Sequence, residues 1–123
     1  MSHIVEIQTL VRDAAAVAAA CGRLGLSPPV ERTVQLLEKA VPGLAFQLPD
    51  WRFPVVCDLA SGTLRYDNYH GIWGEQVHLD LFLQAYAAEK TKLEARRQGH
   101  TVIEQPLADG SLRLTIQVAG DVR

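Results

Sequence analysis

Apolar and polar side chains alternate in short runs along most of the chain, and in two places they repeat at helical spacing. One predicted helix follows Asp13, a good N-cap residue, and ends near Leu24. The other runs from Glu75 to Arg97. The alternating runs predict strands at residues 4–10, 30–37, 44–48, 53–59, 63–69, 101–107 and 111–118.

The helix from Glu75 to Arg97 is the longest amphipathic element of the sequence. Charged residues fill one side of it, and the other side would bury large apolar groups. We therefore expect it to be the element against which the rest of the chain packs. Its predicted apolar face consists of Leu79, Phe82, Leu83, Tyr86 and Leu93.

Glycine and proline mark the predicted turns. Pro42-Gly43 is typical of a hairpin turn between the strands 30–37 and 44–48. Asp109-Gly110 predicts a second hairpin, because Asp-Gly is a strong turn signal between alternating runs. Gly25 would end the first helix.

The elements follow one another in the order β-α-β-β-β-β-α-β-β. A strand, a helix and a hairpin occur twice, in residues 4–48 and 63–118. This order predicts a single α+β domain over residues 1–123, a two-layer sandwich with two helices on one face of an antiparallel sheet of about six to seven strands. The other face of that sheet would be uncovered, so a homo-oligomer is possible.

Composition narrows the function classes. The 123 residues are 48% hydrophobic and 21% charged, with a formal net charge of -2 and no basic block, so we expect no nucleic-acid partner. No apolar run approaches the roughly 20 residues of a membrane span, and the start does not resemble a secretory signal, which predicts a cytoplasmic protein. Cys21 and Cys57 lie in apolar stretches and are expected to be buried thiols.

Candidate chemistry is sparse. His78 and Asp80 point to different faces of the predicted helix, and no zinc-type spacing joins His70 to them, so we predict no metal or other cofactor. Cys57 with a loop histidine is the one candidate nucleophile pair. A core thiol is the favoured reading of Cys57, and the sequence offers no catalytic residue.

The loop between the fifth predicted strand and the long helix is rich in aromatic and polar groups. Such residues either cover the end of a core or form a contact surface, because aromatic side chains on loops are favoured contact anchors. The candidate residues for contact with a partner or ligand are His3, Asp67, Tyr69, His70 and Trp73.

Four motifs in this order resemble the family called domain of unknown function twelve fifty-seven, which includes the hypothetical chloroplast reading frame thirty-five. They are Met1-Ser2-His3, the loop from Tyr66-Asp67 to Trp73-Gly74, residues 82–87 (FLQAYA) and residues 109–114 (DGSLRL). The resemblance spans nearly the whole chain and is closer to bacterial members than to plastid ones. It implies no catalytic residue, since the family has no established activity. It implies an accessory role beside an AAA-type ATPase.

Two hypotheses of function follow. The leading one is a non-enzymatic adaptor that presents the Asp67–Trp73 loop, or the open face of the sheet, to a protein partner such as an AAA-type ATPase. The alternative is a small-molecule-binding or enzymatic domain with a pocket between sheet and helices. In that case His70, His78 or Cys57 would carry the proton or act as the nucleophile.

Overall fold

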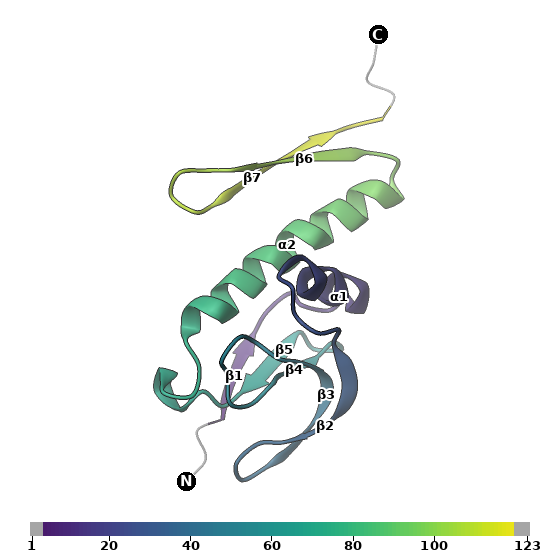
Figure 1. Ribbon diagram of the computed structural model, residues 1–123. Helices are drawn as coiled ribbons and strands as arrows, with labels where there is room; N and C mark the ends of the chain where they lie inside the picture. Colours follow the sequence, from purple (N-terminus) through teal and green to yellow (C-terminus); the bar gives the residue numbers. More distant parts are fainter. Residues whose placement is uncertain (1–3, 120–123) are drawn as a thin grey trace. The chain divides into compact units, whose positions relative to one another are not determined.

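The computed structural model describes residues 4–119, which divide into two compact units at the bond between Tyr86 and Ala87 (Figure 1). The element order agrees with the prediction, apart from a short 3-10 turn, η1, before the second helix. The elements are β1 (Val5–Gln8), α1 (Ala14–Arg23), β2 (Val30–Gln35), β3 (Ala40–Phe46), β4 (Val55–Asp58), β5 (Thr63–Tyr66), η1 (Tyr69–Gly71), α2 (Gln76–Arg97), β6 (Thr101–Pro106) and β7 (Leu112–Gln117).

The strands form two antiparallel sheets. β2, β3, β4 and β5 follow one another as a meander, and β1 pairs with β5, which gives the five-stranded order β1-β5-β4-β3-β2. β6 and β7 form a separate two-stranded sheet. The predicted single sheet of six to seven strands is therefore wrong, although the α+β class with antiparallel sheets is confirmed. Alternation identifies a strand and its faces, but it does not identify the partner of that strand.

The predicted turn at Pro42-Gly43 is also wrong, because both residues lie inside β3. The chain turns earlier, where the backbone N–H of Leu36 donates to the carbonyl of Lys39. Pro42 is tolerated because β3 pairs with β4 only from Leu44 onward, so the missing N–H removes no bond on that side. At Gly43 a Cβ would lie 2.5 Å from the carbonyl oxygen of Cys57, so close strand approach explains this glycine.

One face of the five-stranded sheet carries Leu44, Cys57 and Leu64, which the register places side by side. Figure 1 shows α1 and the first half of α2 on the same side of this sheet. Phe82 of α2 stacks on Phe46 of β3, with ring centroids 4.0 Å apart. The small buried side chains of α1 let that helix approach closely: they are Ala16, Val17, Ala20 and Cys21.

The opposite face of the sheet is covered as well. Ile4, which precedes β1, and Phe53 pack against a buried cluster with members in β2, β3 and β4. β2 and β3 are strongly bent in Figure 1. The expected open face is thus occupied here by the protein's own side chains, namely Val34, Leu36, Val41, Ala45 and Val56.

The second unit, described here as residues 87–119, consists of the second half of α2 and the β6–β7 hairpin. The predicted Asp109-Gly110 turn is present, and Gly110 has a positive φ of 88°. Lys92 of α2 bonds to Glu89 on the helix and to Glu104 on β6, at 3.2 and 2.9 Å. These ion pairs connect the helix to one face of the hairpin.

Candidate functional site

The Asp67–Trp73 loop begins where β5 ends and is built on two buried polar residues, Asp67 and Asn68. One carboxylate oxygen of Asp67 accepts a hydrogen bond from the backbone N–H of Tyr69, at 3.2 Å. The carbonyl of Asn68 accepts from the N–H groups of Gly71 and Trp73, and its side-chain amide donates to the carbonyl of Gly74. These bonds close the loop into a tight turn.

The turn is strained. Tyr69 and His70 have positive φ angles of 45° and 54°, and Gly71 follows at 94°. A left-handed conformation is unfavourable for residues with a Cβ, and each such residue carries on the order of 1–3 kcal/mol of strain. The bonds to Asp67 and Asn68 hold the conformation in spite of that strain. The second carboxylate oxygen of Asp67 is buried, and no hydrogen-bond partner is described for it.

A tryptophan supports the loop from below. Trp51 is buried, its ring meets Tyr66 edge-on at 5.5 Å, and its indole N–H donates to the carbonyl of Glu75. A Cβ on Gly74 would lie only 2.4 Å from this ring. Gly74 is therefore required by the close approach of Trp51. The tryptophan and Tyr66 belong to the core beneath the loop.

The outer side of the loop combines aromatic, cationic and aliphatic groups. Tyr69 and Trp73 lie together with ring centroids 4.7 Å apart, and the guanidinium of Arg52 stands 4.6 Å from the Trp73 ring. The backbone of Arg52 also bonds to the carbonyl of Trp73 at 2.8 Å. Ile72 projects from the turn and is 71% exposed.

The structure brings four of the five predicted contact residues into one loop: Asp67, Tyr69, His70 and Trp73. They have different positions in it, since Asp67 is buried and His70 is exposed. His3 lies outside the described residues. The sequence analysis missed Arg52 and Ile72. The Trp-Arg-Phe run at residues 51–53 could have indicated Arg52, because an arginine beside aromatic residues favours cation–π stacking.

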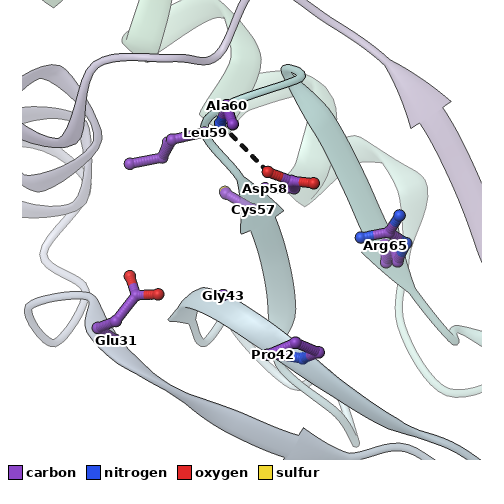
Figure 2. Close-up of a pocket in the computed structure, with 8 residues that line it drawn as sticks. All are labelled: Glu31, Pro42, Gly43, Cys57, Asp58, Leu59, Ala60 and Arg65. Atoms are coloured by element: carbon purple, nitrogen blue, oxygen red, sulfur yellow. Dashed lines mark hydrogen bonds between the residues drawn. The ribbon is translucent and has the colours of Figure 1, made fainter.

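Cys57, the candidate nucleophile, lies apart from this loop. It lines a pocket of about 420 Å³ together with Pro42 and Gly43 of β3, with Glu31 and Arg65 on opposite sides (Figure 2). Burial, together with the nearby Cys21 and Glu31, raises the pKa of Cys57 to about 12. Burial also raises the pKa of Cys21 to about 11. Both cysteines are free and buried, as expected, and neither is activated as a thiolate.

Neither His70 nor His78 lines the pocket of Cys57. His78 lines a different pocket, among apolar residues that include Leu24 and Leu48. The register places Cys57 beside Leu64, whereas His70 follows the far end of β5. The geometry therefore gives no support to a Cys–His pair. Within residues 4–119, no group of three or more His, Cys, Asp or Glu side chains is arranged to hold a metal ion.

Comparisons with known proteins add no family or activity to this geometry. The chain matches no protein-family model, no curated protein and no solved structure. None of the helices described is long and apolar enough to cross a membrane.

Proposed function

We propose that this protein is a non-enzymatic adaptor that binds another protein through the Asp67–Trp73 loop. The observation that carries the proposal is the construction of the loop. Buried polar groups fix a strained turn, and the turn projects an exposed Ile72 beside the stack of Arg52 on Trp73. Strained backbone held in place by its surroundings is common at functional sites.

The side chains at this surface suit a protein partner. Trp, Tyr and Arg are the residue types that most often dominate the energy of protein interfaces. Trp73 and Tyr69 have their rings packed together, and the backbone bond between Arg52 and Trp73 fixes the cation over the indole. Because the groups are already ordered, binding would lose little side-chain entropy.

Two further features of the proposal come from the sequence. The resemblance to the family named domain of unknown function twelve fifty-seven supports an AAA-type ATPase as the partner. A cytoplasmic location is favoured by the two free thiols, because cysteines stay reduced in the cytosol.

The proposal can be tested by quantitative affinity capture from native cells, with wild type and Ile72→Asp compared. A carboxylate at this exposed position should reduce the recovery of the specific partner at least tenfold while leaving the fold intact. Leu37→Asp is the matched control, because Leu37 is an exposed leucine at the turn between β2 and β3. Trp73→Ala should act in the same direction as Ile72→Asp.

Equal recovery by wild type and both loop variants would show that the loop is not the docking surface. If the loop variants lose a partner that is not an AAA-type ATPase, the loop is the docking surface but the proposed identity of the partner is wrong. Circular dichroism of each variant separates loss of binding from loss of fold.

A further inference from the structure

The β6–β7 hairpin leaves apolar surface uncovered. Among residues 87–119, Ala88 and Ala95 are the only buried apolar residues. Ile103, Ile116 and Val118 are 52%, 49% and 45% exposed. An isolated two-stranded hairpin is marginally stable at best, and sheets gain stability from further strands or a covered face. This hairpin therefore has both surface and backbone available for another strand.

The hydrogen bonds of the turn determine which backbone groups point outward. The N–H of Leu107 donates to the carbonyl of Ser111 at 2.9 Å. Bonded and non-bonded pairs alternate in an antiparallel ladder. The register therefore gives bonded pairs at Gln105–Arg113, Ile103–Thr115 and Thr101–Gln117. The intervening residues direct their N–H and C=O groups to the outer edges.

The two outer edges differ. On β6 the outward positions include Pro106, which has no N–H, and proline is a common means of protecting an edge strand. On β7 no proline or glycine interrupts residues 112–118, and Arg113 is the one charged residue. In the part of the chain that the structure describes, no strand pairs with the outer edge of β7. Its outward residues are Leu112, Leu114, Ile116 and Val118.

The sequence of β7 complements itself. If two β7 strands pair antiparallel about Thr115, then Leu114 faces Ile116 of the second copy and Leu112 faces Val118. Arg113 then faces Gln117, and all seven residues from 112 to 118 are paired. Pairing about Arg113 would instead place two arginines opposite each other, which is unfavourable. Pairing about Thr115 also places the outward N–H and C=O groups of one β7 strand opposite the outward N–H and C=O groups of the other.

We propose that two copies of this chain pair through the outer edges of β7 and form one four-stranded antiparallel sheet of order β6-β7-β7-β6. The two-fold axis would pass through the Thr115 pair, so the interface would be isologous. A two-fold axis perpendicular to the sheet places the same face of both hairpins on the same side. The face of each hairpin that carries Glu104, toward Lys92 of α2, would therefore continue across both copies. This interface does not include the Asp67–Trp73 loop, and the dimer proposal does not depend on the proposed function of that loop.

Pairing would cover part of the exposed apolar surface at the edge of β7, where Ile116 is followed by Val118 just after the strand. Ile116 and Val118 would each gain an aliphatic neighbour from the second copy, and the outward N–H and C=O groups would gain partners. One strand edge per copy is a small interface compared with the roughly 800 Å² per partner of a standard complex. We therefore expect a reversible dimer whose population rises with protein concentration.

Sedimentation velocity of the full chain over a range of concentrations tests the dimer. Wild type should shift from monomer to dimer. Thr115→Arg should keep the protein monomeric, because it places two arginines opposite each other only in the dimer. Thr101→Arg is the matched control: Thr101 is an exposed threonine of β6 that shares a hairpin face with Thr115. This control should dimerise like wild type.

Cysteine cross-linking tests the register. Thr115→Cys should form an intermolecular disulfide readily under mild oxidation, because the two Cα atoms of a non-bonded antiparallel pair are about 4.5 Å apart. Ile103→Cys, the cross-strand neighbour on β6, should cross-link at least tenfold more slowly. The native cysteines are buried and provide little background. A monomer at all concentrations, a dimer unaffected by Thr115→Arg, or equal cross-linking at both positions would each overturn the proposal.

Discussion

Residues 4–86 and residues 87–119 differ sharply in how much they bury. The first unit has apolar side chains packed on both faces of its sheet, and the first three of the four residues of β4, Val55, Val56 and Cys57, are buried. In the second unit the strands of the hairpin contain no buried residue. One continuous helix, α2, contributes to both units.

The difference shows that helical periodicity alone does not determine burial. Leu79 and Leu93 belong to the same predicted apolar face, yet Leu79 is buried and Leu93 is half-buried. Phe82 faces a sheet with large side chains, whereas the second half of α2 accompanies a two-stranded hairpin. The large buried side chains of α2, Leu79, Phe82 and Tyr86, all lie in the half of the helix that belongs to the first unit.

The largest expected effect comes from truncating the core of the first unit. Phe82 is fully buried and stacked on Phe46, so Phe82→Ala should lower the free energy of unfolding by about 3–5 kcal/mol. Leu93→Ala, the matched change in the second half of the same helix, should cost about 1 kcal/mol. Urea unfolding monitored by circular dichroism measures both. Equal losses of unfolding free energy in the two variants would show that the two halves of α2 contribute alike to stability.

An intermediate effect is expected at alkaline pH. The pKa of Cys57 is about 12 in the folded protein, above the ordinary value of 9.0. The unfolded chain therefore releases this proton first, and folding stability falls as the pH rises above 9. The slope can reach about 1.4 kcal/mol per pH unit for each such thiol.

Urea titrations between pH 8 and pH 10.5 measure this loss. Cys57→Ala removes a buried side chain and should be less stable than wild type at pH 8. The gap should narrow above pH 9, because the variant lacks one of the two thiols. Both cysteines lie in the first unit, so this pH dependence belongs to it. A gap that stays constant would show that the thiol of Cys57 ionises alike in both states.

The smallest expected effect lies in the second unit. The hydrogen bond to Glu104, followed by the contacts with Glu89, raises the pKa of Lys92 above its ordinary value of 10.5. The stabilisation is therefore present below pH 10.5 and lost at higher pH. Lys92→Met keeps the aliphatic stem and should cost about 0.2–1 kcal/mol.

Amide hydrogen exchange in β6 at neutral pH detects this small change. The control is Lys90→Met, since Lys90 pairs with Glu94 along the helix itself. It should leave the exchange of β6 unchanged. Faster exchange in both variants would mean that the bridge to Glu104 does not secure the hairpin.

Much of the local structure could be predicted from the sequence. Asp13 does cap α1, where its carboxylate accepts from the N–H groups of Ala15 and Ala16. The Asp109-Gly110 turn is equally local, because the chemistry of a few adjacent residues decides it. The element order follows for the same reason. These features do not depend on distant parts of the chain.

The features that could not be predicted depend on distant contacts. Gly43 looks like a turn residue until Cys57 is placed beside it, and the second face of the sheet is covered only when Ile4 and Phe53 meet side chains from other strands. The candidate loop could be located from its aromatic content. Its outer surface could not, because Arg52 reaches Trp73 from a segment that lies about twenty positions earlier.

The pairing of β1 with β5 has a consequence for protein synthesis. Residues 5–8 leave the ribosome long before their partners, residues 63–66. The N–H groups of Arg12 and Asp13 gain their hydrogen-bond partner still later in synthesis, since both donate to the hydroxyl of Tyr86. A nascent chain must therefore carry its first strand unpaired until nearly the whole first unit has emerged. β1 can pair only after β5 has been made, and a pause in translation between the two would leave β1 exposed to chaperones.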